Sequence, residues 1–298
     1  MNYSTATIAD DQSPGHQPNP TSKLDQVLAA TDYPIRPSSQ QDWVTGLFYH
    51  CKLSSAFQPI FDAIENKTIG HAAYARSESN GEAALSPWNI FALASEAEQL
   101  VKLDRLCRTV HAINYFNYLA KQDTKLFLNV QPRLLESVKD DHGKAFEYIL
   151  SLIDEPTSRI VIEIPSEVNR DWKLLKQVIH NYRSRGYQIA INYNSSNRDW
   201  ILELLIELGG FYPNIVRIRI TDLLKHNAVT PLIKTIHQFG AIVLAYDIET
   251  SSQTADAIYA GVDYLQGNFI GKPSQTIQAV SPQVTKEALY PELTDTVI

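Results

Sequence analysis

The chain has 298 residues, of which 44% are hydrophobic and 20% are charged, and its formal net charge is -7 at pH 7. This length has room for one domain of about 240 to 250 residues or for two smaller ones. The acidic balance argues against a generic nucleic-acid binder, which normally presents a basic surface.

Cysteine usage and hydropathy indicate the compartment. Cys51 and Cys107 are far apart and form no CxxC pair, so the sequence predicts neither a disulfide framework nor a zinc site. No run approaches the ~18 apolar residues of a membrane span. The N-terminus lacks the basic and apolar regions of a signal peptide. We therefore expect a cytoplasmic protein with no membrane partner.

The N-terminal region differs in composition from the rest of the chain. Residues 1–22 are polar and rich in Pro, Ser, Thr and Asn, which predicts disorder. Residues 23–32 could form one short helix, residues 34–41 indicate a linker, and a helical approach is expected through Trp43, Leu47 and Phe48. The expected domains are a disordered extension and linker over 1–40, a barrel domain over 41–278 and a C-terminal tail over 279–298.

From Ser55 onward, short apolar runs alternate with longer amphipathic segments. We expect strands over residues 55–61, 68–75, 125–130, 159–164, 188–193, 215–220, 241–246 and 264–269. Helices are expected from Ser86-Pro87 and over residues 172–185, 200–208, 231–239 and 252–260. Repeated strand–helix units of this length predict an α/β fold, a TIM-type (β/α) barrel. A flavodoxin-like or Rossmann sheet is the alternative, but the glycine-rich phosphate loop of the dinucleotide-binding Rossmann sheet is missing.

Polar side chains occupy the ends of the predicted strands, where the chemistry of such a barrel gathers. They are Arg76, Asn129, Glu163, Asn192, Arg217 with Arg219, Tyr246 and Gln266, while Gln58 lies early on the first strand. Two Mg²⁺ or Mn²⁺ ions would require several carboxylates, and this set contains one. It also contains no histidine for nucleophilic catalysis. The strand ends therefore argue against hydrolysis.

Several segments in order resemble the EAL-domain family. They are QPIFDAIENKTIGHAAYAR from Gln58 to Arg76, LSPWNIFALASEAEQL, FLNVQP, IEIPSE, IAINYN, VRIRI, VLAYDIET and YLQGNFIGKP. The resemblance covers roughly residues 50 to 275 and implies the EAL kind of barrel.

The resemblance also implies an activity and a set of functional positions. The family hydrolyses cyclic dimeric GMP with two Mg²⁺ or Mn²⁺ ions. Its signature glutamate falls on Ala72, its paired aspartates on Asn192 and Tyr193, and a further glutamate on Tyr246. Its lysine and aspartate of the next strand fall on Arg217 and Arg219, and the matches retained are Gln58, Arg76, Asn129, Glu163, Glu249 and Gln266. We therefore expect a degenerate member without catalytic residues, metal ions or cofactors, which is not an enzyme.

Several polar residues at the strand ends have a structural alternative to ligand binding. Arg76 could bind a ligand phosphate or pair with Glu163. Arg217 and Arg219 could grip a phosphate without metal, although salt bridging inside a vacated site is favoured. Tyr246 is expected to fill the space of a lost metal ligand.

Three functions follow from these alternatives. The preferred one is a noncatalytic regulatory domain that acts through contacts with an unidentified protein partner. The second is a metal-independent receptor for cyclic dimeric GMP that uses Gln58, Arg76, Asn129, Glu163, Arg217 and Gln266. The third is a residual phosphodiesterase, which the missing carboxylates disfavour. No nucleic-acid partner is expected.

Overall fold

The computed structural model describes residues 21–38, 43–78, 87–119, 123–137, 142–197, 199–225, 229–280 and 289. Residues 1–20, for which disorder is predicted, and the predicted helix start at Ser86 lie outside the described residues. None of the described helices is both long enough and apolar enough to cross a lipid bilayer.

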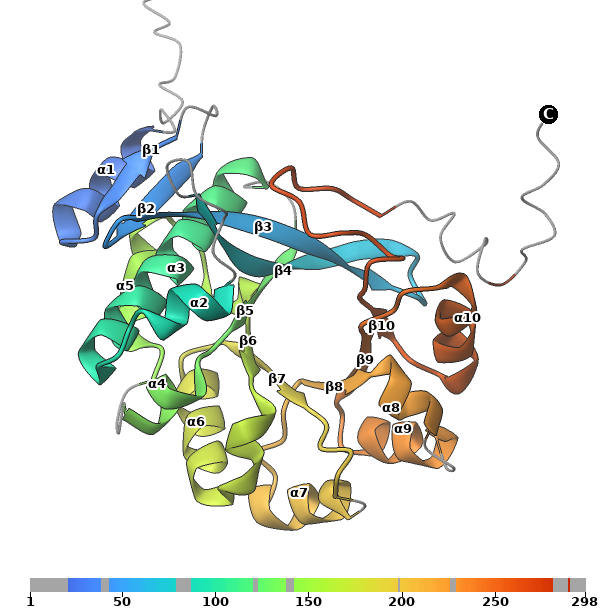
Figure 1. Ribbon diagram of the computed structural model, residues 1–298. Helices are drawn as coiled ribbons and strands as arrows, with labels where there is room; N and C mark the ends of the chain where they lie inside the picture. The colour runs from blue at the N-terminus through green and yellow to red at the C-terminus, as the bar shows by residue number, and fades with distance from the viewer. Residues whose placement is uncertain are drawn as a thin grey trace, which may run out of the picture.

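Eight strands close into a barrel (Figure 1). They are β3 (Cys51–Asp62), β4 (Lys67–Glu78), β5 (Lys125–Asn129), β6 (Ile160–Ile164), β7 (Gln188–Asn192), β8 (Ile215–Arg219), β9 (Ile242–Tyr246) and β10 (Tyr264–Leu265). The strands from β4 to β10 are parallel, whereas β3 is antiparallel to both of its barrel neighbours, β4 and β10. All eight strands predicted from the apolar runs are present, and the predicted barrel is confirmed.

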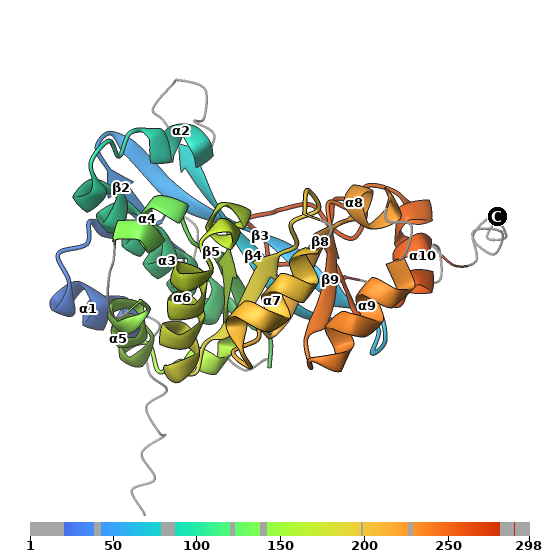
Figure 2. The same ribbon diagram turned by 90° about the horizontal axis from the view of Figure 1, so that it is seen from below.

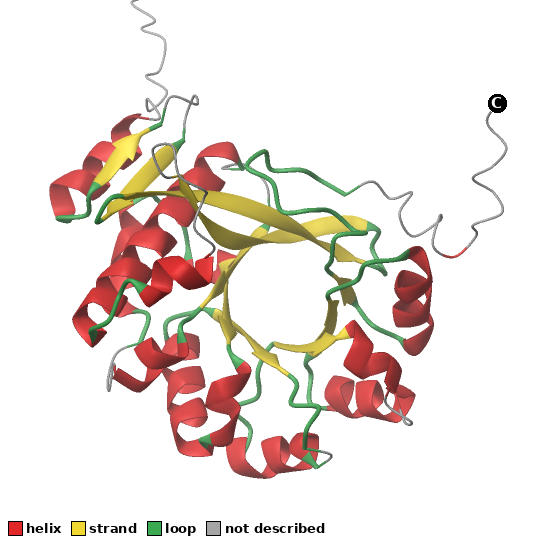
Figure 3. Ribbon diagram, viewed as in Figure 1, coloured by secondary structure: helices red, strands yellow, loops and turns green. Residues whose placement is uncertain are grey.

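Helices cover the outside of the barrel (Figure 3). They are α2 (Pro87–Ala92), α3 (Ala97–Tyr118), α4 (Pro132–Ser137), α5 (Lys144–Leu152), α6 (Trp172–Ser184), α7 (Trp200–Leu208), α8 (Ile220–Lys225), α9 (Val229–Gln238) and α10 (Ser251–Ala260), with 3₁₀ turns at Thr157–Arg159 and Ser166–Arg170. The four predicted helices from residue 172 onward are confirmed as α6, α7, α9 and α10.

The core has an inner and an outer layer. The inner layer fills the barrel with Ile60, Ala72, Phe127, Val161, Ala190, Ile215 and Leu244. The outer layer lies between the strands and the helices, where both faces of the parallel strands are covered. Double coverage explains why runs such as IVIEI are apolar throughout.

The N-terminal segments extend this sheet instead of forming a linker. Helix α1 (Thr21–Ala30) lies beside α5 (Figure 2). Strand β1 (Ile35–Pro37) pairs antiparallel with β2 (Val44–Phe48), which pairs with β3. The short helix is present, but the linker over residues 35–37 and the helical approach through Leu47 and Phe48 were wrong. The Asn114 side chain explains the second error, because it bonds the backbone N–H and C=O of Val44 and holds that segment extended against α3. The domain limits remain a prediction.

Candidate functional site

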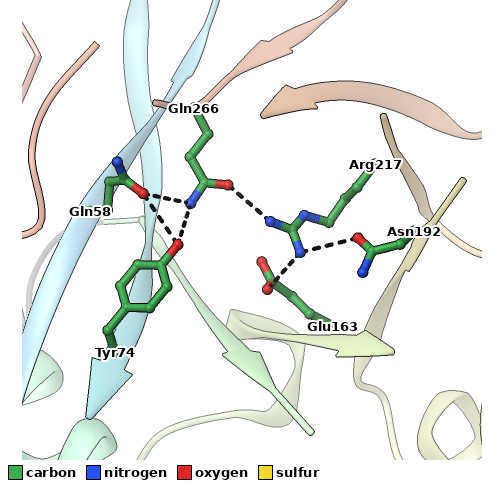
Figure 4. A network of polar contacts seen from close by, with 6 residues as sticks. All are labelled: Gln58, Tyr74, Glu163, Asn192, Arg217 and Gln266. Carbon is green, nitrogen blue, oxygen red and sulfur yellow. Dashed lines mark hydrogen bonds and ion pairs between the residues drawn. The ribbon is translucent and has the colours of Figure 1, made fainter. Parts of the chain in front are cut away.

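A polar layer crosses the barrel where the parallel strands end, and we refer to this end as the mouth. Figure 4 shows its six members: Gln58 on β3, Tyr74 on β4, Glu163 on β6, Asn192 on β7, Arg217 on β8 and Gln266 after β10. Strands far apart in the sequence thus supply one connected set of side chains, as expected for the C-terminal face of such a barrel.

Arg217 lies at the centre of this layer. Its Nη1 donates to Glu163 Oε2 at 2.8 Å and to Asn192 Oδ1 at 3.3 Å, and its Nη2 donates to Gln266 Oε1 at 3.2 Å. Asn192 and Arg217 are register partners, whereas Glu163 lies one strand further, opposite Ala190. The small Ala190 side chain leaves space for the guanidinium to reach across β7.

Two amides and a phenol complete the layer. Gln266 Nε2 donates to Gln58 Oε1 and to the Tyr74 hydroxyl, each at 3.1 Å. The Tyr74 hydroxyl donates to Gln58 Oε1 at 3.2 Å, and Gln58 Nε2 donates to the carbonyl of Gly271 at 3.1 Å. The hydrogen bonds therefore run without interruption from β7 to the segment after β10.

Burial controls the ionisation of this layer. Glu163 and Arg217 are 5% and 6% exposed. Burial raises the pKa of the Glu163 carboxyl, while the adjacent Arg217 guanidinium opposes this shift. Burial also raises the pKa of Tyr74 to about 12, so the phenol stays neutral and able to donate. Among the described residues, Glu163 Oε1 and Arg217 Nε make no hydrogen bond.

Tyr246 lies against both arginines of β8. The guanidinium carbons of Arg217 and Arg219 lie 4.8 Å and 5.7 Å from the centre of its ring. Arg219 is more exposed and donates from Nε to Asp247 Oδ2 at 3.1 Å. Cation–π contacts of this geometry are attractive. The aromatic ring therefore accommodates two like charges on one strand.

Glycine at position 267 allows Gln266 to reach the layer. A Cβ at Gly267 would lie 2.1 Å from the carbonyl oxygen of Ile248. The same close approach brings the Ile248 N–H within 3.2 Å of the Gln266 carbonyl. Any larger residue at position 267 would push the Gln266 segment away from Ile248, which follows β9.

The structure brings together four of the six predicted ligand-binding residues: Gln58, Glu163, Arg217 and Gln266. Arg76 instead donates to the carbonyl of Ala75 at 3.1 Å, and its guanidinium lies 5.8 Å from the Tyr74 ring centre. Asn129, at the end of β5, is exposed and outside the hydrogen-bonded layer. The acid partner suggested for Arg76 is therefore taken by Arg217.

The positions assigned to lost metal ligands have different surroundings. Ala72 is buried in the inner core, and Asn192 bonds Arg217. Tyr193 turns outward, with its ring 5.4 Å from that of Trp200. The retained Glu249 accepts from Asn268 at the surface. Whether these positions once held metal remains a prediction.

Tyr74 was missed in the sequence analysis, although its signal was available. Side chains alternate along a strand, so Ala72, Tyr74 and Arg76 share one face of β4. Ala72 pairs in register with Gln58, which places Tyr74 one step further along the same face. A buried phenol needs a hydrogen-bond partner, and here the two glutamines provide it.

The mouth residues do not fit a pair of divalent ions. Such a pair requires several carboxylate oxygens. The polar layer contains one carboxylate, Glu163, which already binds a guanidinium. Within the part of the chain that the structure describes, no three His, Cys, Asp or Glu side chains form a metal-ligand group.

A sequence profile of the EAL domain matches residues 41–273. A search of curated proteins found no match.

Solved structures share the fold. One is the Bacillus subtilis YkuI protein with an EAL domain, in complex with substrate c-di-GMP and calcium, at 25% identity and TM-score 0.64, covering 81% of this chain and 60% of that chain. A second is a standalone EAL protein from Vibrio cholerae in its c-di-GMP-bound form, at 21% identity and TM-score 0.62, covering 78% and 97%. A third is the PaMucR phosphodiesterase with c-di-GMP, at 18% identity and TM-score 0.63, covering 74% and 92%.

These comparisons correct one prediction. The chain was expected not to be an enzyme, because carboxylates are scarce at its strand ends. The profile match places it among EAL domains, and its structural neighbours include a protein named as a phosphodiesterase. The expectation is therefore wrong, because scarce carboxylates at the strand ends do not exclude enzyme activity in a chain with these relatives.

Proposed function

The chain belongs to the EAL domain family, and we propose that it serves cyclic dimeric GMP signalling as a regulatory domain that acts through contacts with another protein. The observation that carries this proposal is the closed polar layer. The Arg217 guanidinium already engages Glu163, Asn192 and Gln266, the side chains that would otherwise face a ligand.

Opening this layer would be costly. A ligand or cation that drew Glu163 away from Arg217 would separate a buried ion pair, and removing one partner of such a pair typically costs about 3–5 kcal/mol. Any new contact would first have to offset that cost. The closed layer thus favours regulation from the outer surface of the barrel.

Helix α7 offers such a surface close to the mouth. It starts eight positions after Asn192, and its first residue, Trp200, contacts Tyr193. Leu202 and Ile206, four residues apart on one face of the helix, are 58% and 76% exposed. Neighbouring exposed apolar side chains of this kind commonly mark protein contacts.

Calorimetric titration with cyclic dimeric GMP tests the proposal. We expect no binding heat at ~100 µM ligand, either with Mg²⁺ or with EDTA. A Kd in that range would already correspond to weak binding. Micromolar binding would show that the mouth opens for the ligand, and the proposal would then fail. Hydrolysis of cyclic dimeric GMP in Mn²⁺ is followed on the same sample, and turnover would establish a phosphodiesterase instead.

A metal-independent receptor for cyclic dimeric GMP is the second candidate. It is favoured by the unmet hydrogen-bonding atoms of the layer, Glu163 Oε1 and Arg217 Nε, and by the two guanidiniums beside Tyr246. Arginine suits phosphate because its planar fork can donate two parallel hydrogen bonds. Binding that survives EDTA and is lost in Arg217→Ala would establish this function instead.

A further inference from the structure

A cavity lies on the outside of the barrel. It has a volume of about 600 Å³ and is bordered by the turn after α1, by β2, by α3 and by α5. Figure 1 shows these elements grouped at one side of the barrel, outside the ring of strands. The volume lies within the range of ~300–1,000 Å³ that is typical of small-molecule sites.

Most of the lining is apolar. Strand β2 contributes Leu47 and Phe48, and α5 contributes Tyr148 and Ile149. Leu47 and Tyr148 remain 38% and 53% exposed. Leaving such surface in water is unfavourable, so an apolar group placed there would be stabilised.

The α3 wall is basic. Lys102 and Arg105 line the cavity three residues apart, so these two cations are neighbours on the helix surface, and Asp32 also borders the cavity. Lys102 pairs with the exposed Glu98 at 2.7 Å. Arg105 lies near the Tyr33 phenol, whose pKa is raised by burial, so the phenol is neutral and leaves the guanidinium charge in place.

Arg108 borders a smaller cavity together with Arg105, and one of its buried nitrogens lacks a hydrogen-bond acceptor among the described residues. Arg108 is 5% exposed and lines this smaller cavity of about 40 Å³, which shares Arg105 and Ala145 with the larger one. Its Nε lies 2.8 Å from Asp104 Oδ2 and its Nη1 reaches the Tyr182 hydroxyl, but its Nη2 makes no hydrogen bond among the described residues. A buried donor without an acceptor is unfavourable and suits an anionic group.

We propose that the outer cavity binds a small amphiphilic acid. The apolar body of the ligand packs against Leu47, Phe48 and Tyr148. Arg105 holds the carboxylate or phosphate of the ligand. The same arginine also borders the smaller cavity that Arg108 lines. This site is separate from the barrel mouth, so its test is independent of the proposed function.

Calorimetric titration with dodecanoate, below its micelle concentration, tests this site on the full chain. Dodecyl maltoside carries the same tail on a neutral head, and acetate carries the same head without the tail. We expect saturable binding of dodecanoate at one site and at least ~5-fold weaker binding of either comparison compound. Dodecyl phosphate in place of dodecanoate shows whether the site prefers a phosphate head.

Two matched pairs of variants locate the site. Arg105→Gln should weaken dodecanoate binding at least ~5-fold, whereas Arg36→Gln, which removes an exposed arginine outside the cavity, should not change it. Tyr148→Ala should weaken binding as well, and Tyr259→Ala, which removes an exposed tyrosine on α10, should not. Absence of saturable binding, equal binding of the neutral detergent, or unchanged binding in both Arg105→Gln and Tyr148→Ala would overturn the proposal.

Discussion

Arg217 and Glu163 form a buried ion pair across the strand that separates them. Their atoms Nη1 and Oε2 lie 2.8 Å apart, although β7 runs between β6 and β8. The guanidinium thus places a fixed positive charge in the centre of the barrel mouth, next to its one buried carboxylate.

Removal of Arg217 should destabilise the fold strongly. In Arg217→Met the Glu163 charge stays buried without its partner, and the expected loss is about 3–5 kcal/mol in the free energy of unfolding. The double variant Arg217→Met/Glu163→Gln should recover most of this loss, because the uncompensated charge is gone. Urea unfolding measures both.

The exposed pair on the same strand is the control for this experiment. Arg219 and Asp247 are both more than half exposed, so Arg219→Met should cost less than about 1 kcal/mol. A cost for Arg217→Met no larger than that for Arg219→Met would show that the buried pair does not hold the mouth together.

The barrel could be predicted from the sequence because its strands are buried on both faces. Runs such as residues 160–164 and 215–219 are apolar enough to be found without knowing their partners. The segment Val44–Phe48 could not be assigned in this way. Its extended form depends on Asn114, 70 positions away, and a pattern within the segment does not contain that contact.

The composition of the mouth could be predicted in part. Glu163, Asn192, Arg217 and Gln266 were found because they lie at or near the ends of predicted strands, and Gln58 was found on the first of these strands. The suggested pairing of Arg76 with Glu163 was wrong, because sequence position does not determine which of several arginines reaches an acid. That choice depends on register, which places Arg217 opposite Asn192 and one strand from Glu163.

Gly267→Ala should displace Gln266 from the polar layer. The added methyl group would overlap the Ile248 carbonyl oxygen, which is backbone and cannot rotate away. Overpacking of this kind typically costs about 1–3 kcal/mol, measurable as a lower urea midpoint. Gly46→Ala is the comparison, because its Cβ would meet only the flexible end of Leu106 at 3.0 Å. Equal costs for the two variants would contradict this account of Gly267.

Acid should destabilise the protein partly through His111. This histidine is buried, its Nδ1 lies 2.7 Å from Ser55 Oγ, and burial with Arg76 and Arg108 nearby lowers its pKa from 6.5 to about 3. The unfolded chain therefore takes up the proton first. The stability that depends on neutral His111 is complete above pH 6.5 and is lost as the pH falls toward 3.

Urea unfolding between pH 7.5 and pH 4 measures this loss. His111→Gln should be less stable at pH 7.5 but should lose less stability on acidification than the wild type. His180→Gln, at an exposed histidine on α6, should follow the wild-type slope. Parallel slopes for His111→Gln and the wild type would show that His111 does not contribute to acid sensitivity.

The exposed face of α7 should be required for protein contacts but not for folding. Ile206→Lys removes an apolar side chain that is 76% exposed, so the free energy of unfolding should change by less than about 0.5 kcal/mol. Ile64→Lys is its matched control, because Ile64 is 73% exposed in the turn between β3 and β4. A partner is identified by co-purification from host cells and is then rebound as a purified protein. It should bind Ile64→Lys as well as the wild type and bind Ile206→Lys at least ~10-fold more weakly, because a few residues at the centre of an interface carry most of the binding energy. Equal binding of the partner by both variants would exclude this face of α7 as the contact surface.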